Sequence, residues 1–198
     1  MHSIWGFVTD FGDTAVTVPL AIVMFGFLLT TRQPVLALGW ACAIIGCAGT
    51  IGALKIGLAA CGYPLGGVGL SSPSGHTAMS TAVYGGYAAV LGSTLAPAAR
   101  RSLAGATVTL LVAIAVSRAI LHYHSPLEVV IGLGVGLATL AAIFLLATRY
   151  RSPERLPLGR LALCVAIVAL AFHGERWPAE RAIHRLAGLL SILRPWCG

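Results

Sequence analysis

Long apolar runs separated by short polar turns dominate this chain of 198 residues. The runs cover residues 15–30, 35–59, 76–95, 103–122, 126–148 and 161–172. A helix needs roughly 20 apolar residues to cross a bilayer, so the runs predict transmembrane helices, of which the last is short. We expect an all-α polytopic membrane bundle of about six transmembrane helices, folded as a single domain over residues 1–198.

The two ends of the chain differ from these runs. Residues 1–14 combine aromatic side chains with two aspartates and predict an interfacial segment at the level of the lipid headgroups. In residues 178–194, apolar positions recur every three or four residues while Arg181 and Arg185 fall on another face. This pattern predicts an amphipathic C-terminal helix that lies on the membrane surface.

Composition supports a membrane protein. The chain is 58% hydrophobic and only 10% charged, whereas a soluble domain carries roughly 25% charged residues. The net charge of +7 does not indicate a nucleic-acid partner, because the basic residues are scattered between the apolar runs. The five cysteines show no CxxC spacing and are expected to be small packing residues.

The arginines predict an orientation. Loops one–two, three–four and five–six hold Arg32, Arg100, Arg101, Arg149, Arg151, Arg155 and Arg160. Positive loops stay in the cytoplasm, so the opposite loops should face the periplasm or exterior of a bacterial inner membrane. The arginines of the C-terminal tail oppose this orientation if the sixth run spans the membrane.

Two polar clusters interrupt the apolar pattern, SSPSGH at residues 71–76 and SRAILHYHSPLE at residues 117–128. Because successive spans alternate direction, both clusters and Lys55, the only lysine, should lie at the same membrane face. Ionisable groups at membrane depth suggest a functional site. A lysine, an arginine, two histidines and a carboxylate at a headgroup boundary suit phosphate-ester chemistry.

Each residue type has a place in that chemistry. One imidazole could attack phosphorus while another protonates the leaving oxygen. Ser74 and Gly75 begin an expected helix, whose unpaired N–H groups and dipole favour an anion.

These motifs resemble those of the type 2 phosphatidic acid phosphatase superfamily, the lipid phosphate phosphatases. The family pattern reads KxxxxxxRP, then PSGH, then SRxxxxxHxxxD. Residues 73–76 match the second part, and residues 117–128 match the third in spacing, with Glu128 in place of aspartate. Lys55 matches the first part, whose Arg-Pro positions hold Gly62 and Tyr63 here.

The resemblance implies a role for each matched residue. His124 would be the nucleophile that forms a phosphohistidine, Glu128 would orient it, and His76 would be the general acid. Lys55, Arg118 and the Ser74–Gly75 backbone would bind the phosphoryl group. No metal and no cofactor is implied.

The expected function is therefore that of a membrane lipid phosphatase. Candidate substrates are undecaprenyl diphosphate, phosphatidylglycerophosphate, phosphatidic acid and lipid A phosphate, and the short loops favour a polyprenyl diphosphate or another lipid with a small head. Two alternatives stay open: transfer of the phosphoryl group to an acceptor lipid, and an inactive lipid-phosphate binding or transport protein.

Some local alternatives also stay open. Ser125 to Glu128 reads equally as a capping box with proline at the first helical position, a role that could coexist with contact to His124. His122 could lie at the rim or contact substrate. The glycine-rich loop at residues 60–75 could approach a ligand or only turn the chain. The sequence leaves the oligomeric state undecided.

Overall fold

The computed structural model describes residues 2–61, 72–92, 94–150 and 157–175, together with Trp177 and Leu189. Within these residues the chain forms helices and no strands. The helices are α1 (His2–Asp10), α2 (Thr14–Thr30), α3 (Pro34–Cys61), α4 (Gly75–Gly92), α5 (Pro97–Ile120), α6 (Pro126–Arg149) and α7 (Leu158–Phe172). The predicted all-α helical bundle is thus confirmed.

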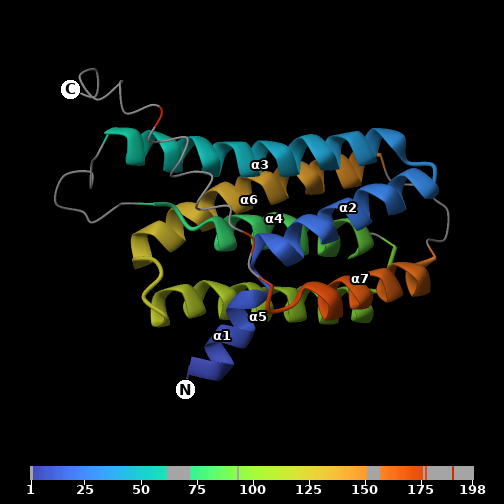
Figure 1. Ribbon diagram of the computed structural model, residues 1–198. Helices are drawn as coiled ribbons and strands as arrows, with labels where there is room; N and C mark the ends of the chain where they lie inside the picture. The colour runs from blue at the N-terminus through green and yellow to red at the C-terminus, as the bar shows by residue number, and fades with distance from the viewer. Residues whose placement is uncertain are drawn as a thin grey trace.

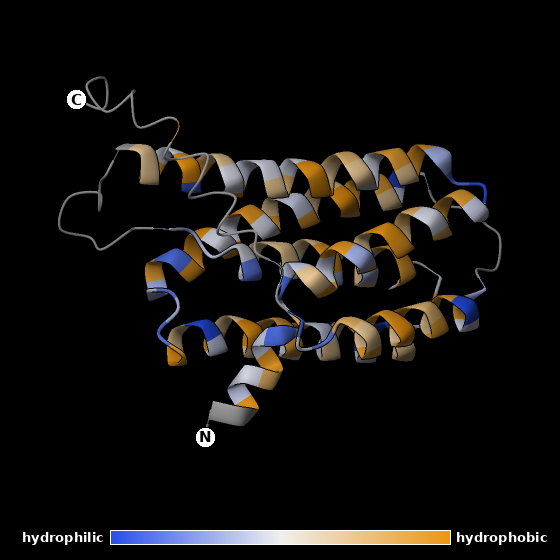
Figure 2. Cartoon of the chain, viewed as in Figure 1, coloured by the Kyte–Doolittle hydropathy of each residue, from blue (hydrophilic) through white to orange (hydrophobic). Residues whose placement is uncertain are grey.

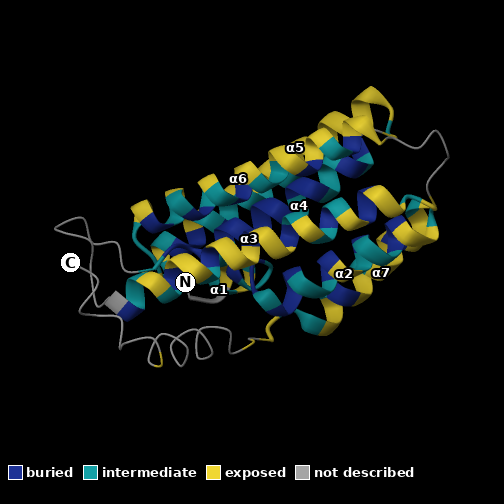
Figure 3. Cartoon of the chain, turned by 90° about the horizontal axis from the view of Figure 1, so that it is seen from above, coloured by how far each residue is buried: buried dark blue, intermediate teal, exposed yellow. Residues whose placement is uncertain are grey.

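Helix α4 is the centre of the bundle. It packs against α2, α3, α5 and α6, and none of its residues is exposed. Figure 1 shows the long helices running side by side, and in Figure 3 the outward faces of α5 and α6 are largely exposed. Because the second motif begins α4, the helices that pack around α4 also position this motif.

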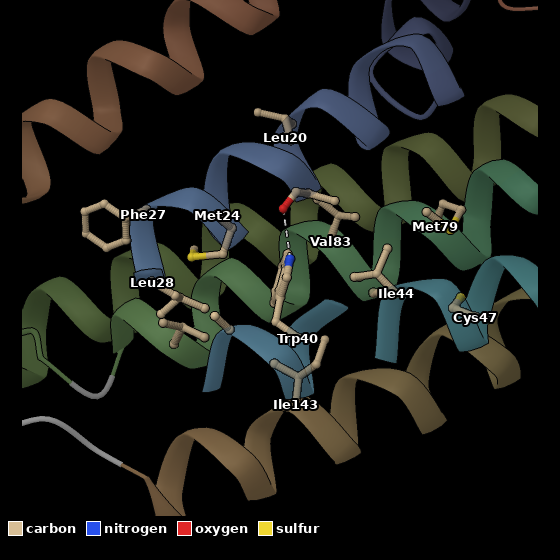
Figure 4. Close-up of a cluster of buried hydrophobic side chains, with 14 of the residues drawn as sticks. Leu20, Met24, Phe27, Leu28, Trp40, Ile44, Cys47, Met79, Val83 and Ile143 are labelled. Carbon is tan, nitrogen blue, oxygen red and sulfur yellow. Dashed lines mark hydrogen bonds between the residues drawn. The ribbon is translucent and has the colours of Figure 1, made fainter. Parts of the chain in front are cut away.

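A tryptophan joins the helices at the middle of the core. Trp40 of α3 is 1% exposed and packs among Leu20, Met24, Val83 and Ile143, which come from α2, α4 and α6. Its indole N–H donates to the Ala21 carbonyl at 2.9 Å, as Figure 4 shows. A buried indole needs such an acceptor, so the bond fixes the ring. The ring in turn sets how closely α2, α4 and α6 pack around α3.

Two glycines bring α6 close to α4. A Cβ on Gly136 would lie 2.6 Å from Thr81 Cβ and 2.8 Å from the Ala78 carbonyl oxygen. A Cβ on Gly132 would collide with the carbonyl oxygen of Ser74. Small residues four apart allow helix backbones to approach closely in membrane proteins. The start of α4 is therefore in direct backbone contact with α6.

The outer surface is apolar, as a lipid-facing surface must be. Exposed large hydrophobic residues lie on every outer helix, among them Ile45, Val108, Leu145 and Leu170, and Figure 2 shows apolar residues along the outward faces. Within the part of the chain that the structure describes, four helical segments are long and apolar enough to cross a membrane: Ile4–Thr30, Pro34–Ala60, Pro97–Ile120 and Pro126–Arg149. The chain is an integral membrane protein.

The predicted spans correspond closely to α2 through α7. Helices α2, α4 and α7, with 17, 18 and 15 residues, are shorter than α3, α5 and α6, which have 28, 24 and 24, and at 1.5 Å per residue α7 covers only about 22 Å. The count of six spans therefore stays a prediction. Nearly all of the amphipathic segment at 178–194 and all of residues 62–71 of the glycine-rich loop lie outside the described residues.

Candidate active site

Four helix ends meet at one end of the bundle, at the left in Figure 1. These are the C-terminal ends of α3 and α5 and the N-terminal ends of α4 and α6. A cavity of about 380 Å³ opens here, and Lys55, Gly75, His76, Arg118 and Tyr123 form part of its wall. The alternation of spans predicted this meeting of Lys55, His76 and Arg118 at one membrane face. Asp10, Asp13 and Trp177 also line the cavity.

His124 and Glu128 are in direct contact. His124 Nδ1 lies 3.0 Å from Glu128 Oε2, and both side chains are almost fully buried, 8% and 4% exposed. A carboxylate can only accept, so Nδ1 carries the hydrogen and Nε2 keeps its lone pair. This is the tautomer that a nucleophilic imidazole needs.

The surroundings of His124 favour its neutral form. Burial lowers the pKa of His124 below its usual value, and the positive charges of Arg118 and Lys55 lower it further, while the bond to Glu128 acts in the opposite direction. His124 is not among the described residues that line the cavity. It interacts electrostatically with Lys55 and Arg118, and these two residues do line the cavity. The imidazole thus sits next to the cationic wall.

Glu128 caps helix α6 and contacts the histidine at the same time. Its Oε2 accepts the Ser125 N–H at 3.0 Å, and its own N–H donates to Ser125 Oγ at 3.3 Å, which completes the capping box. Its Oε1 accepts the Ser72 N–H at 2.7 Å. The two roles left open by the sequence therefore coexist.

A sharp turn after α5 brings His124 back toward Arg118. The N–H groups of Tyr123 and His124 both donate to the Arg118 carbonyl, at 3.1 and 3.2 Å, and His122 N–H donates to Ala119. His122 adopts a positive φ of 55°, which is the αL conformation in which many helices end. Its side chain is exposed and is not among the described cavity-lining residues, which favours the rim position over substrate contact.

The two cations are held in place by neighbours. Arg118 is 8% exposed; its Nη1 donates to Thr9 Oγ1 at 3.1 Å, and its guanidinium stacks 4.5 Å from the centre of the Tyr123 ring. The Lys55 ammonium lies beside the start of α4, since a Cβ on Gly75 would be 3.9 Å from Nζ. Both cations are therefore positioned before any ligand enters.

Ser74 is bonded to α6, and its expected role as a backbone phosphate contact stays a prediction. Its N–H already donates to the Glu128 carbonyl at 3.0 Å, and its hydroxyl faces the Thr77 hydroxyl at 3.0 Å. Ser74 is fully buried. The N–H groups of Gly75 and His76 belong to the first turn of α4, where helix geometry provides no intrahelical acceptor, and both residues line the cavity.

The structure adds a residue that the motifs do not contain. Asp13 is 8% exposed, and its Oδ2 lies 3.4 Å from His76 Nε2. The sequence placed Asp13 in an interfacial segment, and no pattern in a single sequence connects positions 13 and 76. Thr9, which contacts Arg118 across 109 positions, was missed for the same reason. Tyr123 lies within the third motif, at a position that the family pattern leaves unspecified, and was therefore not singled out.

The arrangement has the components for phosphoryl transfer. It presents a neutral imidazole with a free Nε2 lone pair, two fixed cations, a helix N-terminus and a second histidine. Among the described residues, no group of three or more His, Cys, Asp and Glu side chains is placed to hold a metal ion.

Comparison with known proteins agrees with the motifs. The profile of the PAP2 superfamily matches residues 54–152, which contain Lys55, His76, Arg118, His124 and Glu128. An uncharacterized 22.5 kDa protein in the cps region of Klebsiella pneumoniae is 27% identical over 188 residues, covering 92% of this chain and 90% of that protein. No solved structure matches the chain.

Proposed function

Because the chain belongs to the PAP2 superfamily, whose members are phosphatases, we propose that it is a membrane lipid phosphatase that works through a phosphohistidine. The substrate is a lipid monophosphate or a polyprenyl diphosphate. The observation that carries this proposal is the 3.0 Å contact between His124 and Glu128 beside a cavity lined by Lys55, Arg118 and His76.

The first step forms a bond between His124 Nε2 and phosphorus. As it forms, the bond from phosphorus to the lipid oxygen breaks, and His76 donates a proton to that oxygen. Lys55, Arg118 and the N–H groups at the start of α4 stabilise the charge on the phosphoryl oxygens. Glu128 stabilises the positive charge that develops on His124.

The second step releases phosphate. Water attacks the phosphohistidine, His76 takes a proton from it, and the bond between His124 and phosphorus breaks. The product is inorganic phosphate and both histidines regain their starting states. This mechanism uses only groups of the protein and water, so it should proceed when divalent metals are chelated.

The size of the site favours a small headgroup. A cavity of about 380 Å³ is near the lower end of the range for small-molecule sites, roughly 300–1,000 Å³. It suits a phosphate or diphosphate on a lipid tail better than a sugar-bearing head such as that of lipid A. Undecaprenyl diphosphate is the first substrate to try, with phosphatidylglycerophosphate and phosphatidic acid beside it. We propose that the site faces the periplasm across a bacterial inner membrane, because the arginine-rich turns, which the positive-inside rule assigns to the cytoplasm, connect the opposite ends of the helices.

The test is phosphate release by detergent-purified protein in EDTA from this panel of lipids, with lipid A phosphate included. We expect wild type to release phosphate and His124→Ala to release none. In wild type, denaturation in alkaline detergent during turnover of a labelled substrate should trap a phosphoryl adduct on His124. Loss of wild-type activity in EDTA would contradict the metal-free mechanism. Product that carries the phosphoryl group on an added acceptor lipid would instead identify a transferase, and binding without turnover would identify a binding protein.

A further inference from the structure

Asp13 lies outside the matched family region and still contacts the proposed general acid. It precedes α2 as its N-cap: Oδ1 accepts the Ala15 N–H at 2.8 Å, while Oδ2 lies 3.4 Å from His76 Nε2. One oxygen of the carboxylate thus caps α2, and the other faces the His76 ring. The matched region begins at residue 54, so the family motifs assign no role to this carboxylate.

The junction between α1 and α2 is fixed in this position. A Cβ on Gly12 would lie 2.9 Å from Ile114 Cγ2 and 3.3 Å from His76 Cδ2, so only glycine lets the chain pass this close to α4 and α5. The Phe11 carbonyl accepts the Tyr84 hydroxyl at 2.7 Å. These contacts hold Asp13 against His76 independently of any substrate.

The charges around His76 explain why a carboxylate is useful there. Lys55 of α3 and Arg118 of α5 line the same cavity, and both disfavour a positive charge on the imidazole. Burial disfavours it as well. A general acid must carry a proton when the substrate arrives. Asp13 and Asp10 of α1 supply negative charge in the same cavity.

We propose that Asp13 is a positioning residue that holds His76 as an imidazolium, turned toward the cavity, for the cleavage step. This proposal rests on the phosphatase function proposed above. In the step, the Nδ1 proton of the imidazolium moves to the leaving lipid oxygen as the P–O bond breaks. The proton on Nε2, which faces Asp13, stays on the ring, and Asp13 stays a carboxylate throughout. When water later attacks the phosphohistidine, its proton returns to His76 and restores the ion pair.

Two substitutions separate this role from helix capping. Asparagine caps a helix as well as aspartate, so Asp13→Asn keeps the cap and replaces the charged oxygen that faces His76 with an uncharged amide N–H2 group, whereas Asp13→Ala removes the cap as well. We expect Asp13→Asn to keep the wild-type Tm in detergent, to lower kcat about tenfold or more, and to change KM little. The alkaline limb of its pH–rate profile should move to lower pH by about one unit, because an opposite charge at this distance favours the protonated form. Asp13→Ala should show the same kinetic loss together with a lower Tm.

A second measurement does not depend on turnover. Hydrogen–deuterium exchange at the imidazole C2 position, followed by mass spectrometry of the peptides that contain His76 and His124, gives the titration midpoint of each histidine. We expect the His76 midpoint to fall in Asp13→Asn while that of His124, the internal reference, changes less.

The two proposals can fail separately. If wild type and His124→Ala both release no phosphate but the His76 midpoint still falls in Asp13→Asn, the phosphatase function fails and the coupling of Asp13 to His76 stands. If wild type is active and Asp13→Asn has the same kcat, alkaline limb and His76 midpoint, Asp13 is only a helix cap and the inference is overturned.

Discussion

Glu128 Oε1 accepts the backbone N–H of Ser72 at 2.7 Å, across 56 positions of the sequence. The other oxygen of the same carboxylate contacts His124 and Ser125. One side chain therefore ties the segment leading into the second motif to the histidine of the third. The Ser74 N–H adds a parallel bond to the Glu128 carbonyl at 3.0 Å, so the two motifs are joined by both main chain and side chain.

This bridge predicts that aspartate, the residue of the family pattern, is a poor substitute at position 128. Glu128→Asp shortens the side chain by one methylene, so the carboxylate cannot keep Ser72, Ser125 and His124 together. We expect kcat to fall about tenfold or more, since a misplacement of 1 Å can cost up to about 100-fold. Phosphate release measured beside wild type checks this. Equal or higher activity in Glu128→Asp would contradict the bridging role.

Glu128→Gln separates catalysis from capping. Glutamine is as acceptable as glutamate at this position of a capping box, so α6 should stay intact. Its amide N–H2 group cannot accept the Ser72 N–H as Oε1 does, so Tm in detergent should fall by the loss of that bond alone. The negative charge that supports the developing imidazolium is lost, and kcat should fall about 100-fold or more. A Glu128→Gln protein with normal turnover would reduce Glu128 to a helix cap.

The acidity of His124 predicts the acid limb of the pH profile. The pKa of His124 is lowered by burial and by Arg118 and Lys55, and the nucleophile must be neutral. Activity should therefore persist below the usual histidine pKa of about 6.5 and decline only at lower pH. In Glu128→Gln, where the carboxylate no longer favours the imidazolium, the residual activity should have its acid limb at still lower pH. Rate profiles of kcat/KM for both proteins measure this, and a limb that moves to higher pH in the variant would be inconsistent with it.

Local and periodic features were readable from the sequence, whereas contacts between distant segments were not. The apolar runs gave α2 to α7, and alternation placed Lys55, His76 and Arg118 at one face, because both rules act along the chain. The burial of Asp13 depends instead on Gly12 fitting against Ile114. The Ser74 N–H donates to the carbonyl of Glu128, which lies 54 positions further along the chain. Such tertiary contacts leave no periodic signal in one sequence.

The close approach of α6 to α4 predicts that Gly132 is sensitive to substitution. A Cβ there would collide with the Ser74 carbonyl oxygen, so Gly132→Ala must push the second motif away from Glu128. We expect a loss of about 1–3 kcal/mol in stability together with a loss of activity. A Cβ on Gly134 of the same helix would have nothing within 4 Å. Gly134→Ala should therefore keep the stability and the activity of wild type. Thermal unfolding and phosphate release of the two variants provide the comparison, and equal behaviour would refute the packing argument.

The αL turn at His122 predicts that this position matters for the backbone conformation of the turn and that the imidazole does not contact substrate. At a φ of 55° a non-glycine residue is strained by about 1–2 kcal/mol, and glycine relieves the strain. His122→Gly should therefore keep or raise Tm and should hold the Arg118-to-His124 turn in place. Because the His122 side chain is exposed, kcat and KM should stay within about twofold of wild type, as expected for a surface substitution. A large rise in KM with an unchanged Tm would show instead that the imidazole contacts the lipid headgroup.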